Sequence, residues 1–285
     1  MLSENLFLIL IALIWIIAAV IQDFRKREIA NWWNFSLIAV ALAYRGFISV
    51  WIWNFGFFIY GLFGLGIFIG FAYLLYYGRI FAGGDAKLLM GVGAALPFYN
   101  LFYTNVKIFL YFILLLMFCG GIYGACYSII LSYKHRKAFS KEFLKQLKNN
   151  KKFILGFVAL AILSMIIILF AQAYLLSLFS LIIIGFPFLY VYAKSIEESC
   201  MIKEVQPAKL TLGDWLYKEI KIGKKLIKPS WEGLSEKELA VLKKSRKKVL
   251  LKEGIPFTPA FFFAFIVLIW FLQRNMLDLF YSLGI

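Results

Sequence analysis

Two aspartates stand out among the side chains that could do chemistry. The chain has 15 Asp and Glu residues, and only Asp23 and Asp85 combine a place at the end of an apolar segment with an unusual local sequence. A carboxylate at the edge of hydrocarbon is costly unless it is paired or hydrated, so each is a functional candidate. Two carboxylates about 3 Å apart cannot both ionise easily. One then holds a proton while the other acts as a base on water.

Each aspartate also has a purely structural interpretation. Asp23 can be a helix-end charge that reaches interfacial water. Asp85 can cap a helix N-terminus, where the helix dipole favours a carboxylate. The small residues Ala82, Gly83 and Gly84 before it allow another backbone or a substrate to approach closely. A catalytic aspartate can also cap a helix, so the two interpretations of Asp85 are compatible.

The few cysteine and histidine residues do not form a recognisable catalytic or metal-binding pattern. The 3 cysteines form no Cys-x-x-Cys pair, so they predict neither a disulfide framework nor a zinc site. The 1 histidine, His135, lies in a run of basic residues and is expected to be a solvated loop residue. A Ser-His-Asp triad or a Cys-His nucleophile is therefore hard to build. We expect no metal and no cofactor.

Membrane helices must position the two aspartates. Hydrophobic residues make up 63% of the 285 residues and charged residues 16%, and the mean hydropathy is +0.83. Such a composition excludes an ordinary soluble domain and intrinsic disorder. Segments of about 20 apolar residues, the length that crosses a bilayer, recur along the chain. Seven are clear, and an eighth is weaker because it carries Asp85 and Lys87. In chain order the eight segments are 6–22, 33–53, 55–77, 80–98 (the weak one), 106–132, 153–171, 173–193 and 257–273.

The charge distribution predicts the orientation. Of the 31 Lys and Arg residues, 28 lie in four segments that the positive-inside rule places in the cytoplasm. These segments are 23–32, 78–87, 133–152 and 194–256. The arrangement requires the weak segment 80–98 to cross the membrane, because otherwise the last two basic segments would face the side opposite the first. Both termini are then expected outside, and Asp23 and Asp85 share the cytoplasmic face of a plasma-membrane protein.

The net charge of +16 fits this topology. Basic residues beside membrane helices meet anionic lipid head groups at about 1 kcal/mol each. We therefore predict anionic lipids as a partner and no nucleic acid. The first apolar segment lacks a basic start and a small-residue cleavage site, and Arg25-Lys26-Arg27 follows it, so we expect a retained anchor.

These features predict an all-α polytopic membrane protein with about eight transmembrane helices and a small cytosolic α+β insert before the last helix. We expect a membrane domain over 1–193 that carries both aspartates, and the insert over 194–254. The last transmembrane helix and an outside tail are expected over 255–285.

Several local patterns give further predictions. Lys209–Leu216 predicts short strands and a turn, in which Gly213-Asp214 is an ordinary turn dipeptide. The Ser-x-x-Glu pattern at Ser235–Glu238 predicts a helix cap. The glycine spacings in Gly66–Gly70 and Gly120–Gly124 predict close helix packing inside the protein.

The two aspartate motifs resemble those of type IV prepilin peptidases. Asp23–Asn31 is similar to the Asp-x-basic…Ile-x-Asn signature of the family. Ala82–Lys87 resembles its Gly-x-Gly-Asp motif with the following Ala-Lys, although Ala82 replaces the first glycine. The entry into the last helix, 253–261, resembles the archaeal branch, which includes the preflagellin peptidases. The resemblance extends over nearly the whole chain.

This resemblance implies a membrane-embedded aspartic endopeptidase of the GxGD type. The implied residues are Asp23 and Asp85 for catalysis, and Asn31, Gly83, Gly84 and Lys87 for support or substrate binding. The implied substrates are pilin-like or archaellin precursors, from which a short basic leader is removed at the cytosolic membrane face. Bacterial relatives often pair a zinc-binding cysteine cluster with N-methylation, and the sequence has no such cluster. Peptidase activity without N-methyltransferase activity is therefore expected.

Other classes of protein stay open. A proton-coupled transporter could use Asp23 or Asp85 as a relay, although we find no clear internal repeat of the kind common in transporters. A presenilin or signal-peptide-peptidase-like protease shares the Gly-x-Gly-Asp pattern, but its Tyr-Asp and Pro-Ala-Leu motifs are not found. Lys87 is equally a candidate for a snorkelling anchor.

Overall fold

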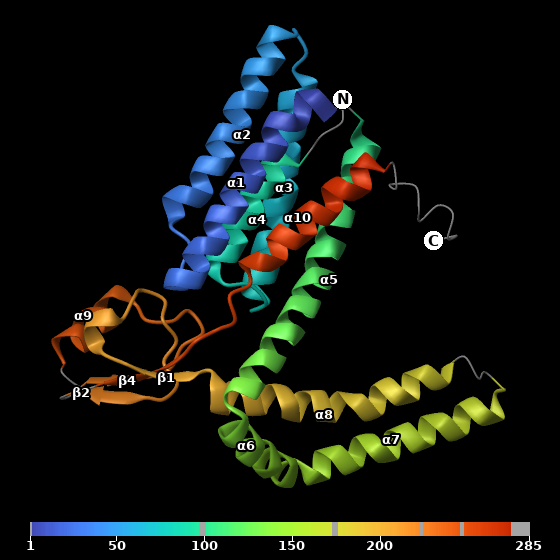
Figure 1. Ribbon diagram of the computed structural model, residues 1–285, viewed down its shortest axis with the longest axis vertical. Coiled ribbons are helices and arrows are strands. Elements are labelled where there is room, and N and C mark those ends of the chain that lie inside the picture. The colour runs from blue at the N-terminus through green and yellow to red at the C-terminus, as the bar shows by residue number, and fades with distance from the viewer. Residues whose placement is uncertain (1, 97–100, 173–175, 223–224, 246–247, 275–285) are drawn as a thin grey trace. The chain divides into compact units, whose positions relative to one another are not determined.

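The computed structural model divides the chain into two compact units. It describes residues 2–96, 101–172, 176–222, 225–245 and 248–274. The first unit comprises 1–125 and 255–285, and the second comprises 126–254. Figure 1 labels the helices and strands of each unit. The division of the chain into 1–193, 194–254 and 255–285 concerns membrane crossing and stays a prediction.

The described part of the first unit is built from helices. They are α1 (Leu2–Lys26), α2 (Asn31–Trp51), α3 (Gly56–Tyr77), α4 (Gly83–Ala95), α5 (Phe102–Lys134), which continues into the second unit, and α10 (Thr258–Gln273). Apolar side chains from all of them form one buried core, which includes Leu8, Leu37, Phe68, Leu89 and Phe265. The chain forms helices here because apolar residues dominate every segment and backbone groups in hydrocarbon must be paired within the segment.

The expected membrane segments are helical over most of their described length. In the part of the chain that the structure describes, the six helices α1, α2, α3, α5, α7 (Lys151–Phe170) and α8 (Ser177–Cys200) are long and apolar enough to cross a membrane. Helix α10 has 16 residues and α4 has 13. At 1.5 Å per residue α4 is about 20 Å long, against about 30 Å of hydrocarbon. The expected segments 80–98 and 173–193 and the tail 255–285 extend in part outside the described residues.

Helix α4 lies among other helices of the first unit. It contacts α2 and α3 extensively, and most of its residues are buried. Its glycines allow this approach, since a Cβ atom at Gly91 would lie 2.9 Å from Leu37 of α2, and one at Gly93 would overlap Phe68 of α3. A short helix is tolerated in this position because protein, rather than lipid, surrounds it.

The glycine spacings predicted to mark close packing have mixed outcomes. A Cβ atom at Gly120 would collide with Phe257 at the entry to α10, so packing is tight at this position. Gly66, Gly70 and Gly124 have no neighbouring atom within 4 Å of such a Cβ. The packing prediction is therefore wrong for the pair Gly66 and Gly70. The repeat fits close packing in general, but its residues do not face a neighbouring helix here.

A buried arginine of α2 binds the last carbonyl groups of α4. Arg45 of α2 is fully buried, and its guanidinium donates to the carbonyl oxygens of Ala94 and Ala95, both at 3.0 Å, and of Phe57 at 3.1 Å. The last carbonyls of a helix have no intrahelical partner and carry the negative end of its dipole. Arg45 supplies donors and a positive charge to this end of α4. It also lies over the Phe57 ring, 4.5 Å from the ring centre.

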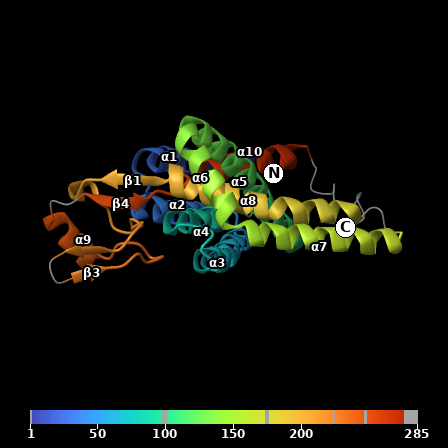
Figure 2. The same cartoon turned by 90° about the horizontal axis from the view of Figure 1, so that it is seen from below.

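The second unit contains a helical part and a small α+β insert. After the end of α5, the helical part consists of α6 (Arg136–Asn149), α7 and α8. The elements of the insert are β1 (Ile202–Val205), the short helix η2 (Pro207–Lys209), β2 (Ile220–Ile222), β3 (Lys225–Ile227), α9 (Glu236–Lys244) and β4 (Val249–Lys252). Strand β1 pairs antiparallel with β4, side by side in both views (Figure 1 and Figure 2), and β2 pairs with β3.

Several predictions for this unit can be compared with the structure. Helix α8 continues to Cys200, so residues 194–200 prolong the helix. The strands predicted within Lys209–Leu216 are wrong, because only Leu216 forms an isolated bridge there. The turn is confirmed, with Gly213 at a φ of +86°. The cap at Ser235–Glu238 is also confirmed and starts α9. His135 is exposed between α5 and α6, as expected.

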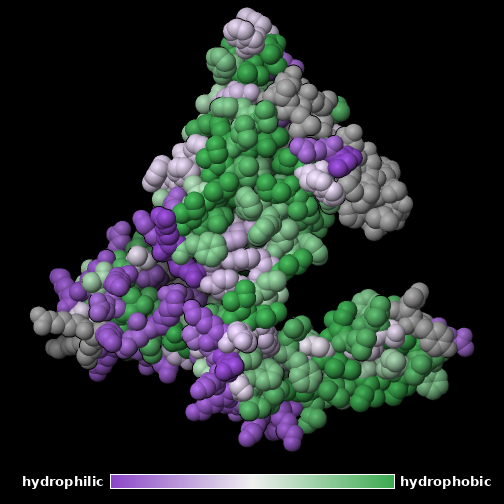
Figure 3. Space-filling view, viewed as in Figure 1, coloured by the Kyte–Doolittle hydropathy of each residue, from purple (hydrophilic) through white to green (hydrophobic). Residues whose placement is uncertain are grey.

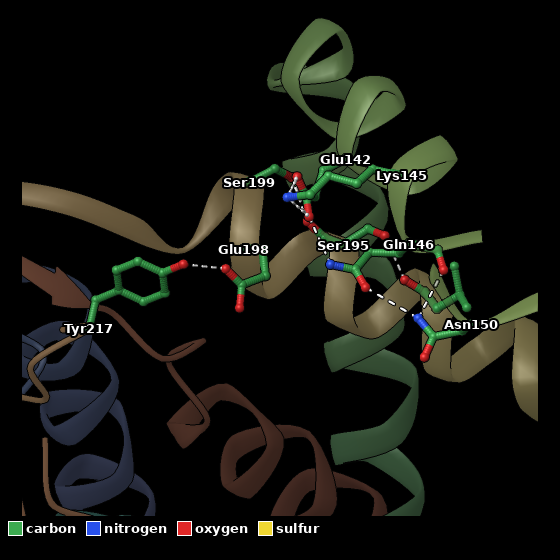
Figure 4. A network of polar contacts seen from close by, with 9 residues as sticks. Glu142, Lys145, Gln146, Asn150, Ser195, Glu198, Ser199 and Tyr217 are labelled. Carbon is green, nitrogen blue, oxygen red and sulfur yellow. Dashed lines mark hydrogen bonds and ion pairs between the residues drawn. The ribbon is translucent and has the colours of Figure 1, made fainter. Parts of the chain in front are cut away.

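Polar contacts join the insert to α8 (Figure 4). The Tyr217 hydroxyl donates a short hydrogen bond to Glu198 near the end of α8, which raises the pKa of Tyr217 to about 12. On α6, Gln146 and Lys145 both donate to Glu142, at 2.8 and 3.1 Å. These two bonds hold the pKa of the Glu142 carboxyl below its usual value.

The surface of the membrane-type helices and the surface of the insert differ in polarity (Figure 3). On the face shown, apolar side chains predominate on the helices of the first unit and on α7 and α8, whereas the insert is mainly hydrophilic. Helix α7 exposes large apolar side chains along its length, including Leu155, Leu160, Ile162 and Ile167. Such surfaces are normal for helices that face lipid and abnormal for a soluble protein.

Candidate active site

Asp23 lies in the last turns of α1. The helix ends at Lys26, and Arg27 adopts the left-handed conformation with φ 57°, its N–H donating to the Asp23 carbonyl at 2.9 Å. The Gln22 side chain then accepts a bond from the Ala30 N–H at 3.1 Å, which closes the turn into α2. The Asp23 side chain is 8% exposed. It is therefore a buried carboxylate, and the interpretation of Asp23 as a solvated helix-end charge is wrong.

Asp85 is the third residue of α4, and its carboxylate accepts a hydrogen bond from the backbone N–H of Ala82, the N-cap residue. The helix dipole favours a negative charge in this first turn. Asp85 does cap the helix, but from inside its first turn. The residue is 7% exposed.

The structure brings the two aspartates together. Helices α1 and α4 are in contact, and the charge of Asp23 acts on the Asp85 carboxyl group. Both residues are buried in the first unit, although they lie 62 positions apart in the sequence. Such a pair can act on a water molecule as acid and base.

The four supporting residues predicted from the sequence lie at the same helix ends. The Lys87 ammonium donates to Asn31 Oδ1 at 2.7 Å, which links the start of α4 to the start of α2. A Cβ atom at Gly84 would lie 3.4 Å from Ile29, and one at Gly83 would lie 3.8 Å from Tyr76. Gly84 thus packs directly against the turn that follows Asp23. Their participation in substrate binding stays a prediction.

Two further residues at this position were not identified from the sequence. Thr258, the first residue of α10, is fully buried and donates to Asp23 Oδ2 from its hydroxyl at 2.9 Å and from its backbone N–H at 3.3 Å. Asn34 of α2 is fully buried and donates to the Gly84 carbonyl at 3.3 Å. Its Oδ1 has no hydrogen-bond partner among the described residues. The Thr-Pro start of α10 signals a helix N-terminus, but no local pattern points to Asp23.

The other Gly-Asp dipeptide has a local role. Asp214 accepts bonds from the backbone N–H of Thr211 at 2.7 Å and from the Thr211 hydroxyl at 2.9 Å, which closes a turn in the insert. Among the residues that the structure describes, no group of three or more His, Cys, Asp or Glu side chains is placed to hold a metal ion.

The architecture is that of a polytopic α-helical membrane protein with a small insert. Residues 10–125 match the profile of the type IV leader peptidase family. The segment that carries Asp23 and Asp85 is therefore similar to this family of peptidases. The match ends before α6, the insert and α10. Comparisons with curated proteins and with solved structures gave no match.

Proposed function

We propose that this protein is an aspartic endopeptidase in which Asp23 and Asp85 form the catalytic pair. The observation that carries the proposal is the burial of two interacting carboxyl groups inside the segment that matches the family. One carboxylate takes a proton from water, and the resulting hydroxide attacks the scissile carbonyl carbon. The protonated partner donates to the carbonyl oxygen. The first carboxyl group then gives its proton to the leaving amine as the C–N bond breaks. The partner takes back the proton from the oxygen of the tetrahedral intermediate, which restores both groups and completes hydrolysis.

The proposed substrates are pilin-like or archaellin precursors whose short basic leader precedes an apolar helix. The family match supports a precursor of the pilin type. Exposed apolar residues Trp32, Tyr77 and Ile80 lie at the start of α2, at the end of α3 and before α4. These positions flank the aspartate motifs and suit an apolar substrate helix that lies between lipid and protein. We propose that cleavage occurs without N-methylation.

The proposed orientation places both aspartates and the insert at the cytoplasmic face. The basic segments that support it include α6, with exposed Lys141, Lys145 and Lys148 on one side. Anionic lipid head groups are the proposed partners of these side chains.

The test is cleavage of a purified precursor by the reconstituted full chain. Asp23→Asn and Asp85→Asn should each lower the rate by about 100- to 10,000-fold, the usual loss when a general acid or base is removed. Asp214→Asn is the matched control, because it changes an aspartate of the same dipeptide in a turn of the insert. It should cleave as the wild type does.

Other outcomes would overturn the proposal. Substantial cleavage by either site variant would show that the pair is not catalytic. Proton-driven uptake of a solute without cleavage would indicate a transporter. A cut within the precursor helix, rather than before it, would indicate a protease that resembles presenilin.

A further inference from the structure

The start of α10 contacts both segments that carry an aspartate. Thr258 is fully buried, and its hydroxyl and backbone N–H converge on one oxygen of Asp23, Oδ2. The neighbouring Phe257 packs against Phe81 with ring centres 5.1 Å apart, and Phe261 lies 5.9 Å from the same ring. Phe81 is four residues before Asp85 and is buried. One helix end thus touches the surroundings of both carboxyl groups.

Two donors on one oxygen restrict the rotation of a carboxylate. The χ2 torsion of aspartate is broad and roughly two-fold, so an unrestrained group samples many orientations. With Oδ2 held by Thr258, the plane of the carboxylate is fixed. Oδ1 is the oxygen that Thr258 does not use. Acid–base chemistry needs this oxygen within hydrogen-bond reach of the water and of the partner carboxyl group.

We propose that Thr258 is a positioning residue that fixes Asp23 Oδ2 and keeps Oδ1 available to the attacking water and to Asp85. This inference rests on the proposed function and adds a residue to it. Thr258 lies outside the segment 10–125 that matches the family, so the family match does not assign it. A purely structural alternative is that Asp23 only caps the N-terminus of α10.

The experiment compares Thr258→Val and Thr258→Ser in the full chain, with the same precursor. Valine keeps the shape of the side chain and removes the hydroxyl donor. We expect kcat to fall by about 100-fold, because a small displacement of a reacting group lowers the rate by about this factor. KM should stay within about two-fold of the wild-type value because the substrate contacts remain. Serine restores the donor and should return kcat to near the wild-type value.

The chain offers a matched control in Thr211. It also donates its hydroxyl and its backbone N–H to an aspartate, Asp214, but in the insert. Thr211→Val should leave both kcat and KM unchanged. Thermal unfolding of every variant in detergent checks that the fold is retained. If Thr258→Val does not fold, Thr258→Ala removes the same donor without adding a methyl group that must be packed.

The outcomes separate this inference from the proposed function. Wild-type cleavage that is lost in Asp23→Asn but unchanged in Thr258→Val would overturn the inference and leave the function standing. Equal losses in Thr258→Val and Thr258→Ser would also overturn it, because packing alone would then explain them. Absence of cleavage by the wild type would overturn both.

Discussion

Among single side chains, Arg45 makes the clearest energetic prediction. Its guanidinium is buried in the first unit and bonds three carbonyl oxygens. Arg45→Met would leave these oxygens without this donor, at about 1–3 kcal/mol each. Methionine carries no charge, so the variant no longer has the cost of burying one, and this offsets part of that loss. We expect a net destabilisation of about 2–4 kcal/mol, measured by denaturant unfolding in detergent.

A second substitution tests the geometry of the Arg45 site. Arg45→Lys keeps the charge but replaces a planar fork by a single ammonium group, which cannot match the same three acceptors. Its stability should lie between those of the wild type and Arg45→Met. Lys141→Met, at an exposed position of α6, is the surface control and should change stability little. A variant Arg45→Met as stable as the wild type would contradict the capping role.

The contact between Lys87 and Asn31 is expected to contribute less energy than the contacts of Arg45. The pair joins the starts of α4 and α2 but is exposed, so solvent weakens it. Cleavage rates of Lys87→Met, Asn31→Ala and the double variant form a double-mutant cycle. We expect a coupling energy of about 0.5 kcal/mol between the two positions. Strictly additive effects would mean that Lys87 only anchors the chain at the interface.

The sequence was informative where chemistry depends on local pattern. Asp23 and Asp85 could be identified because a carboxylate beside an apolar segment is unusual wherever it occurs. Thr258 and Asn34 could not, because their partners lie far away in the chain. The bond from Thr258 to Asp23 joins residues 235 positions apart. Threonine is so common at the start of helices that its presence there does not predict a distant aspartate as its partner.

Among the elements, α9 depends on a cap that titrates. The Ser235 hydroxyl and backbone N–H donate to Glu238 and hold the pKa of the Glu238 carboxyl below 4.5, its ordinary value. A depressed pKa means that the stabilisation is fully present above pH 4.5 and is lost as the pH falls below it. We expect amide exchange in α9 to accelerate at acid pH, measured by hydrogen exchange.

The control for this effect is Ser235→Ala. This variant loses the hydroxyl contacts of the cap at every pH, which costs about 1 kcal/mol of helix stability, and keeps the bond from the backbone N–H of residue 235 to Glu238. Its exchange in α9 should be faster near neutral pH and should change less on acidification. Exchange rates in β1 and β4 should respond less to the substitution. Identical pH dependence in the wild type and Ser235→Ala would rule out the cap as the cause.

Element lengths were harder to predict than element positions. Hydropathy and charge bias located α4, but the helix has only 13 residues, and Arg45 binds the carbonyls at its end. That contact comes from another helix and leaves no local mark. The failed strand prediction at Lys209–Leu216 has a similar cause. Alternating apolar residues suit a strand, yet this segment closes a turn around Asp214 and contributes Leu210 and Leu216 to the small core.

For the whole molecule, the topology is the main prediction. In a chain from which Cys119, Cys126 and Cys200 have been removed, Lys148→Cys and Lys237→Cys should react with an impermeant thiol reagent from the cytoplasmic side. Leu101→Cys, exposed between α4 and α5, should react only from outside. The reason is the concentration of positive charge in alternate connections. Labelling of the Lys148 and Lys237 positions from opposite sides would contradict the eight-crossing arrangement.

The late position of α10 in the chain has a consequence for biosynthesis. Residues 126–254 are made between the family-matched segment and the helix that contacts Asp23. At about 5–20 residues per second, a ribosome needs about 7–27 s to pass from residue 125 to Thr258. A nascent chain in this interval has both aspartates but not the threonine that holds one of them. We therefore expect a newly inserted chain to become proteolytically competent only after α10 has docked against α1, which delays activity until synthesis of the membrane part is nearly finished.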